Sequence, residues 1–246
     1  MYKRQAKEAA QILAANGIKV YLFEELKPVP ELSFSIRYLK TTAGIAVTAS
    51  HNPAKYNGYK AYGSDGAQLN PELATIVLDE IGKTDIFTGV KKMDFEQAID
   101  QGMIVMIGDE VEEAYLDEVQ KQCVNPELAK EKGDTLKFVY TPFHGAGNKP
   151  VRKILKRIGF NNVVVVKEQE LPDGDFPTVE SPNPENKEGF KLAIGYAKEC
   201  GADLIVGTDP DSDRVGILVK NDKGEYVTFT GNQVGTLLSE LSLIHI

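Results

Sequence analysis

The sequence contains very little cysteine and no tryptophan. Its 246 residues include only Cys123 and Cys200, which form no CxxC pair and are too few for a disulfide framework. We therefore expect a reduced, cytoplasmic protein. The chain also lacks an apolar run of the ~20 residues that a membrane-spanning helix needs, and it lacks the pattern of a secretory signal. We expect no membrane partner.

Positive charge is scarce as well. The chain carries 28 Lys and Arg against 36 Asp and Glu, which gives a formal net charge of −8 and a pI near 5.1. A surface with this balance disfavours nucleic acid and anionic lipid as partners, although a local basic pocket for phosphate is compatible with it. We expect the partner to be a small molecule.

The residues that are present predict a globular protein. The apolar fraction is 42% and the charged fraction 26%, with no low-complexity tract, so the chain has enough apolar material to build real cores. Its length lies between one large domain and two ordinary ones. The distribution of helix and strand patterns favours two.

The first half combines helical and strand patterns with one irregular stretch. Apolar spacing and glycine or proline signals predict a helix over 6–15, strands over 18–23 and 44–47, and a helix over 71–82. Leu73, Ile76, Val77 and Ile81 form the apolar side of that last helix. Residues 83–105 are poorly periodic, and we place a domain boundary there.

The second half alternates regularly between strands and helices. After a helix around 111–119, strands are predicted over 136–140, 162–166 and 203–206, with helices over 151–158 and 190–200 between them. This order indicates βαβ units and a mainly parallel sheet. The predicted fold is α/β with two similar domains, residues 1–105 and 106–246, each a mainly parallel or mixed sheet flanked by helices.

Two polar loops follow the ends of predicted strands, at residues 48–53 and 207–214. Ligands gather at the carboxyl ends of strands in such sheets. The second loop carries Asp209, Asp211 and Asp213 at alternate positions, so three carboxylates can converge on one hard divalent cation. An EF-hand would need Gly and Glu where Arg214 and Lys220 stand. The simpler alternative is a solvated acidic turn.

The first loop contains Ser50 beside His51 and Asn52, with Lys60 further along. A serine and a histidine adjacent in sequence are weak evidence for a nucleophile and base, and a surface turn is the alternative. Ser50 becomes a stronger candidate when it is considered together with the acidic loop. A phosphoserine adds about −1.5 to −2 charges, and one of its oxygens can complete a Mg²⁺ site that carboxylates leave open.

These two loops resemble a known family. Thr-Ala-Ser-His-Asn-Pro at 48–53, followed by Tyr-Asn-Gly-Tyr-Lys at 56–60, resembles the phosphoserine loop of the α-D-phosphohexomutases. Asp-Pro-Asp-Ser-Asp-Arg at 209–214 resembles their metal loop. Further similarity to the phosphoglucomutase and phosphopentomutase branch lies in residues 66–68, 141–145, 181–184 and 229–232.

The resemblance implies a Mg²⁺-dependent isomerase that moves a phosphoryl group within a sugar phosphate. Phospho-Ser50 would give its phosphoryl group to a sugar monophosphate, and the resulting bisphosphate would return the other phosphate. Glucose 1,6-bisphosphate or an equivalent sugar bisphosphate would act as activator. The sugar itself, glucose, mannose or a pentose, stays open.

The resemblance also implies roles for individual residues. Ser50 and the three aspartates would hold Mg²⁺, and Lys60 would assist proton transfer. The remaining candidates would orient phosphate, substrate or the metal loop: His51, Asn52, His144 and Arg214. For His144 a structural hydrogen bond is an equal alternative, and for Lys60 a plain surface position is the alternative.

The resemblance covers the first two of the family's four domains. The sugar-recognition and distal-phosphate loops would lie outside this chain, so we expect the chain alone to be inactive as a mutase. We expect residues 1–5 and 242–246 to be non-native. Two other functions stay open: a Mg²⁺-dependent phosphatase with Asp209 as nucleophile, and a non-catalytic module that binds metal or phosphate.

Overall fold

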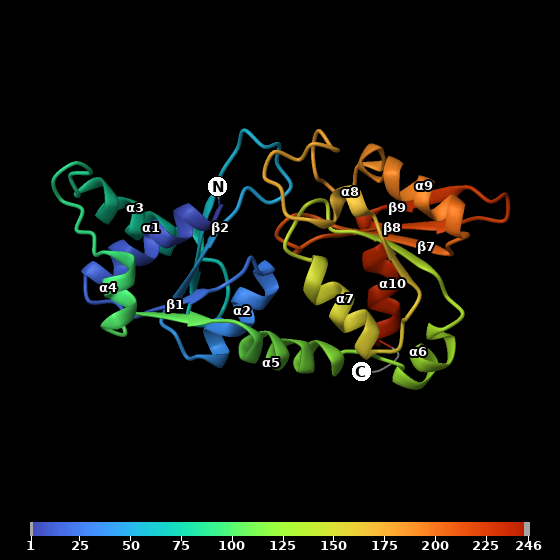
Figure 1. The fold of residues 1–246 in the computed structure, drawn as a ribbon, viewed down its shortest axis with the longest axis horizontal. Coiled ribbons are helices and arrows are strands. Elements are labelled where there is room, and N and C mark those ends of the chain that lie inside the picture. Colours follow the sequence, from blue (N-terminus) through green and yellow to red (C-terminus); the bar gives the residue numbers. More distant parts are fainter. Residues whose placement is uncertain (1, 244–246) are drawn as a thin grey trace. The chain divides into compact units, whose positions relative to one another are not determined.

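The computed structural model describes residues 2–243. Residue 1 and residues 244–246, parts of the ends expected to be non-native, lie outside the described residues. The chain forms two compact units (Figure 1). The first contains the chain up to Lys27 together with Glu31–Thr48 and Asn57–Glu112; the second contains Pro28–Pro30, Ala49–Tyr56 and the chain from Glu113 onward. No helix among the described residues has the length and apolar content to cross a membrane.

The first unit combines helices with two pairs of strands. Its elements are α1 (Tyr2–Ala15), β1 (Val20–Phe23), α2 (Val29–Tyr38), β2 (Ala43–Val47), β3 (Tyr59–Gly63), α3 (Pro71–Gly82), α4 (Phe95–Asp100) and β4 (Ile104–Ile107). Strand β1 pairs in parallel with β4, and β2 pairs antiparallel with β3. A small core of Ala10, Ala14, Ala98 and Ile104 holds α1 and α4 against the first pair.

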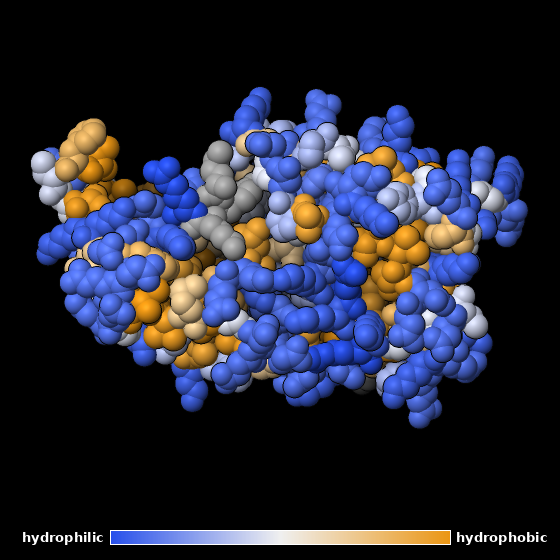
Figure 2. All heavy atoms as spheres, viewed as in Figure 1, coloured by the Kyte–Doolittle hydropathy of each residue, from blue (hydrophilic) through white to orange (hydrophobic). Residues whose placement is uncertain are grey.

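Helix α3 begins and ends where the sequence predicts, but its predicted apolar side is not buried. Asn70 caps the helix, since its Oδ1 accepts the backbone N–H of Leu73 at 2.9 Å. Leu73, Ile76, Val77 and Ile81 are all exposed, by 43–59%. The apolar side of this helix is therefore exposed in the described structure. Figure 2 shows hydrophobic side chains gathered over the part of the first unit that carries α3.

The second unit is built around one mixed sheet of five strands. After α5 (Asp109–Gln120) and α6 (Pro126–Gly133), its elements are β5 (Phe138–Thr141), α7 (Asn148–Arg157), β6 (Val163–Val165), α8 (Lys167–Glu170), η1 (Lys187–Phe190), α9 (Lys191–Cys200), β7 (Leu204–Thr208), β8 (Val215–Lys220), β9 (Tyr226–Phe229) and α10 (Gly231–Leu243). The strand order is β6-β5-β7-β8-β9. The first three strands are parallel, and β8 and β9 add antiparallel pairs.

The sheet brings two loops to one edge. Strands β5 and β7 run in parallel, with Thr141 opposite Gly207, so the segments that follow them leave the sheet at the same place. Residues 142–147 lead into α7, and residues 209–214 lead into β8. The α/β class and the βαβ order predicted for this half are confirmed, whereas β8 and β9 were not predicted.

The core of the second unit depends on its aromatic residues. Phe190 is fully buried and packs edge-on against Phe143, with ring centroids 5.1 Å apart.

We expect Phe190→Ala to lower the free energy of unfolding by about 3–5 kcal/mol, because it leaves a cavity. Phe87→Ala is the matched control, since Phe87 is 91% exposed and should change stability by at most about 0.5 kcal/mol. Urea unfolding measures both, and equal losses would contradict the assigned core.

Candidate functional site

The acidic loop brings its three aspartates together. One carboxylate oxygen from each of Asp209, Asp211 and Asp213 lies within 4.8 Å of the other two. Asp209 and Asp211 are buried and Asp213 is exposed. Clustered carboxylates of this kind offer the oxygen ligands that Mg²⁺ and Ca²⁺ prefer. The convergence expected from the alternate spacing is therefore present in the structure.

Asp209 organises the loop around its own side chain. Its Oδ1 accepts the backbone N–H groups of Asp213 at 3.1 Å and Arg214 at 3.0 Å. Its carbonyl oxygen accepts the N–H of Ser212 at 3.0 Å, and Ser212 has a left-handed φ of 56°. These bonds fold the chain back after β7, as a tight turn requires.

The neighbouring carbonyl groups of the loop are also occupied. The carbonyl of Pro210 accepts the N–H of Ala146 at 2.8 Å, and that of Asp211 accepts the N–H of Val29 at 2.8 Å. Both donors belong to the second unit. These bonds hold the backbone of the loop at Pro210 and Asp211.

The electrostatics of the cluster favour a bound cation. Burial raises the pKa of the Asp209 carboxyl to about 8, and the negative charges of Asp211 and Asp213 act in the same direction. The backbone N–H of Arg214 acts against them. A divalent cation bound there would offset the free-energy cost of burying the charged carboxylates and would reduce the repulsion among them. The donor set thus fits a hard metal ion.

Ser50 lies beside this cluster, although it is far away in sequence. Its Oγ donates a hydrogen bond to Asp209 Oδ2 at 3.1 Å and lies 3.2 Å from His51 Nδ1. The backbone of Ser50 is left-handed, with φ 53°, a conformation that is uncommon for a residue other than glycine and concentrates at functional sites.

The serine loop is held by its own polar groups and by one from another segment. The Asn52 side chain donates to the carbonyl of Ala49 at 2.9 Å, which closes the turn. Ser181 Oγ donates to the carbonyl of His51 at 3.0 Å. The loop, residues 49–56, belongs to the second unit by its contacts. Its hydroxyl therefore shares a unit with the three aspartates.

The other predicted site residues lie in different settings. Lys60 is half-buried in β3 of the first unit, opposite Ala46. Arg214 is exposed. His144 is buried, with Nε2 2.9 Å from Thr178 Oγ1 and Nδ1 3.2 Å from the carbonyl of Leu171. Both ring nitrogens of His144 thus have partners outside the acidic loop.

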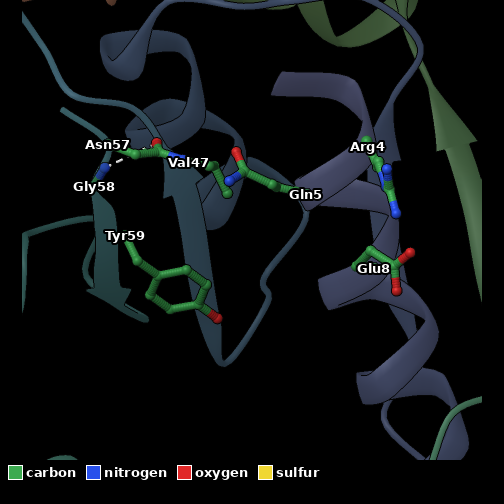
Figure 3. A pocket seen from close by; sticks show the side chains of 7 residues that line it. All are labelled: Arg4, Gln5, Glu8, Val47, Asn57, Gly58 and Tyr59. Atoms are coloured by element: carbon green, nitrogen blue, oxygen red, sulfur yellow. Dashed lines mark hydrogen bonds between the residues drawn. The ribbon is translucent and has the colours of Figure 1, made fainter. Parts of the chain in front are cut away.

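A pocket of about 520 Å³ lies elsewhere, in the first unit (Figure 3). Residues from α1 and from the facing ends of β2 and β3 line it: Arg4, Gln5, Glu8, Val47, Asn57, Gly58 and Tyr59. The predicted site residues are not among them. The chemistry-bearing residues of this chain therefore gather at a sheet edge of the second unit rather than in this pocket.

Two models of one protein family match this chain. The family model for phosphoglucomutase/phosphomannomutase α/β/α domain I matches residues 3–86, and the model for domain II matches residues 113–224. The chain belongs to this family. The resemblance to the phosphohexomutase family that the sequence shows is confirmed. The division predicted at residue 105 lies between the two matched segments and stays a prediction.

Individual relatives agree with the family match. The chain is 38% identical over 239 residues to a phosphoglucomutase of Staphylococcus saprophyticus, covering 97% of this chain and 42% of the relative. It is 37% identical over 240 residues to a Haemophilus influenzae protein named as a phosphomannomutase, covering 95% and 46%. A crystal structure assigned as a phosphomannomutase from Thermus thermophilus superposes with a TM-score of 0.71 at 26% identity, covering 95% and 48%. The chain thus spans less than half the length of these relatives.

No prediction from the sequence covered the backbone contacts that hold the acidic loop at Pro210 and Asp211. Residues 142–147 join β5 to α7, and Ala146 donates to the loop. Val29, in the short segment between Pro28 and Pro30, donates to it as well. The glycines at 145 and 147, in a loop at the same sheet edge, are the signal that points to a close backbone approach.

Proposed function

We propose that this chain carries the phosphoserine and metal-binding part of a phosphoglucomutase-type enzyme. The observation that carries the proposal is the 3.1 Å approach of Ser50 Oγ to Asp209 Oδ2 within a cluster of three carboxylates. A serine in this place can hold a phosphoryl group next to a bound cation. Membership of the family supports the same function.

The proposed metal ligands are Asp209, Asp211, Asp213 and one oxygen of a phosphate on Ser50. Magnesium held there would neutralise the charge that moves with the phosphoryl group. The aspartates supply the negative charge and the fixed geometry, since Asp209 is anchored by two backbone N–H groups. The phosphate on Ser50 supplies the oxygen that completes the site.

The proposed reaction has two phosphoryl transfers, one from Ser50 to the sugar and one of the sugar's other phosphoryl group back to Ser50. In the first half, the Oγ–P bond of phospho-Ser50 breaks while a sugar hydroxyl forms a new O–P bond and loses its proton. The product is a sugar bisphosphate and a free serine hydroxyl. In the second half, Ser50 Oγ takes the other phosphoryl group, and the hydroxyl released on the sugar regains a proton. The sum is an isomerisation of the sugar phosphate.

The remaining candidate residues would assist proton transfer, stabilise negative charge or support the turn that carries Ser50. His51 Nδ1, 3.2 Å from Ser50 Oγ, can exchange a hydrogen bond with the hydroxyl when the serine is free. Lys60, as a cation, would act as acid or electrostatic stabiliser. Arg214 is an exposed cation next to the cluster, suited to a phosphate of the substrate. Asn52 supports the turn that presents Ser50.

A labelling experiment tests this function. The 246-residue chain is incubated with Mg²⁺ and glucose 1,6-bisphosphate carrying labelled phosphate, and the labelled peptide is identified by mass spectrometry. We expect a slow, acid-stable label on Ser50 that requires Mg²⁺ and is prevented by EDTA. A label on Asp209 that hydroxylamine removes would instead identify an aspartate-nucleophile phosphatase. No label with Mg²⁺ present would favour a non-catalytic binding module.

The same incubation separates labelling from turnover. With glucose 1-phosphate added, we expect no detectable glucose 6-phosphate from this chain, which spans 42% of its Staphylococcus saprophyticus relative. Phosphoryl transfer depends on holding donor and acceptor in line, and the loops expected to hold the sugar were predicted outside the chain. Turnover near an ordinary enzyme's ~10 s⁻¹ would show that these residues suffice for the whole reaction.

A further inference from the structure

Three hydroxyl groups meet at Gly147, next to the acidic loop. A Cβ atom added to Gly147 would lie 2.7 Å from each of Tyr140 Oη, Thr208 Oγ1 and Ser212 Oγ. Tyr140 and Thr208 are buried, and their hydroxyl oxygens are 2.8 Å apart. A hydroxyl pair at this distance is hydrogen-bonded. Only glycine leaves room for all three hydroxyls at this position.

The backbone just before Gly147 also lies close to the acidic loop. A Cβ atom added to Gly145 would lie 2.4 Å from Pro210 Cα and 2.6 Å from the Pro210 carbonyl oxygen. Ala146 donates its N–H to that carbonyl at 2.8 Å. Residues 145–147 therefore run close to the loop, which is possible because Gly145 and Gly147 lack a side chain.

The contacts fall on alternate residues of the loop. Thr208, Pro210 and Ser212 are the ones held by Tyr140 and by residues 145–147. The intervening residues Asp209, Asp211 and Asp213 carry the clustered carboxylates. The loop is thus held at residues 208, 210 and 212 and also at the Asp211 carbonyl, which accepts the N–H of Val29, whereas its three carboxylate groups converge on the candidate cation.

This division matters because the carboxylates repel one another. Repulsion between close, partly buried like charges favours an open loop with separated carboxylates as long as no cation is bound. A loop fixed by backbone contacts keeps the carboxylates together beforehand, so less of the cation's binding free energy is spent on gathering its ligands. Groups that only orient the ligands can therefore set the affinity.

We propose that Tyr140, Gly145 and Gly147 are positioning residues for the acidic loop, which hold Asp209, Asp211 and Asp213 in a metal-ready arrangement without touching the metal. The proposal rests on the proposed function only in taking the three aspartates as the cation ligands. Outer-shell partners of metal ligands are commonly worth about 10–100-fold in affinity, and we expect these residues to lie in that range.

The test uses Mn²⁺ as the probe and the 246-residue chain, with bound Mn²⁺ followed by electron paramagnetic resonance. The double variant Tyr140→Phe/Thr208→Val removes both hydroxyls at once, so no buried hydroxyl of this pair loses its partner and the fold is largely spared. We expect its Kd for Mn²⁺ to rise about 10-fold, at the lower end of outer-shell effects. Gly147→Ala should raise the Kd further.

Two substitutions in helix α9 serve as matched controls. Gly195→Ala places a Cβ atom where nothing lies within 4 Å. Tyr196→Phe removes a hydroxyl that donates to Glu168 at 2.9 Å, away from the loop. Both should bind Mn²⁺ like the parent chain. Urea unfolding of the metal-free variants separates affinity from stability, because a purely structural role would lower stability and leave the Kd unchanged.

The outcomes distinguish this proposal from the metal site itself. If Asp211→Asn weakens Mn²⁺ binding but the folded Tyr140→Phe/Thr208→Val variant binds like the parent, the positioning role is wrong and the metal site stands. If the parent does not bind Mn²⁺, or Asp211→Asn leaves the Kd unchanged, both proposals are wrong. If Gly147→Ala fails to fold, the double variant decides alone. Parent-like affinity in Thr208→Ser, which keeps the hydroxyl, supports the proposal.

Discussion

Ser50→Ala is expected to abolish covalent phosphorylation of the chain completely. Ser50 Oγ is the hydroxyl that lies 3.1 Å from the carboxylate cluster, and alanine offers no oxygen to form the O–P bond. Alanine also has a Cβ atom, so the left-handed backbone at this position is no more strained than with serine. The fold should therefore persist, and phosphate incorporation measured by mass spectrometry should fall to zero.

The matched control for this variant is Ser239→Ala. Ser239 is exposed in α10 and lies outside the acidic cluster, so the label should remain. Binding of Mn²⁺ should survive in Ser50→Ala, because the unphosphorylated serine is neutral and the three aspartates supply the charge. A label that persists in Ser50→Ala would place the nucleophile on another residue and contradict the proposed reaction.

The acidic loop could be predicted from sequence because its geometry is local. Asp209, Asp211 and Asp213 alternate directly after a buried strand, and a short turn leaves carboxylates at such a spacing few ways to separate. The site for Ser50 is different, since Ser50 and Asp209 are 159 residues apart. Their proximity comes from tertiary packing, and it was anticipated through the Mg²⁺ site that a phosphoserine could complete and through the family resemblance.

Several helices and strands were not predicted from the sequence, including α2, β3, β4, β8 and β9. Strand β4, Ile104–Ile107, begins inside a stretch that shows little periodicity, and four residues are too few to define a period. Strands β8 and β9 pair antiparallel beyond the acidic loop, and neither was predicted from the sequence. Strands β5, β6 and β7 are also short, but they alternate with helical patterns, and this alternation predicted them correctly.

Helix α3 shows what an amphipathic pattern leaves open. Its cap and first-turn proline are local features, and both act as predicted. Burial of its apolar side depends on a partner surface, which a sequence pattern cannot reveal. The same limit applies to Tyr140 and Gly147, whose contacts with Thr208 and Ser212 depend on how neighbouring strands of the sheet are ordered.

Asp209→Asn is expected to produce the largest loss of metal binding among the three aspartates. Asp209 is fully buried, its Oδ1 accepts two backbone N–H groups, and its Oδ2 accepts from Ser50. Asparagine removes the charge and replaces one acceptor oxygen by an NH₂ group that cannot accept. The loss should exceed the roughly 100-fold upper range of outer-shell effects, and Mg²⁺-dependent labelling of Ser50 should fall with it.

Asp203→Asn is the matched control, because Asp203 precedes the other end of the same strand and its Oδ2 also accepts a backbone N–H, that of Lys137 at 3.0 Å. It should leave the Kd for Mn²⁺ unchanged. Asp213→Asn should weaken binding less than Asp209→Asn, since Asp213 is exposed and water can replace part of its contribution. Titration of the three variants with Mn²⁺ gives the order directly. If Asp203→Asn and Asp209→Asn weakened binding equally, the effect would come from general charge loss, and Asp209 would not be the central ligand of the site.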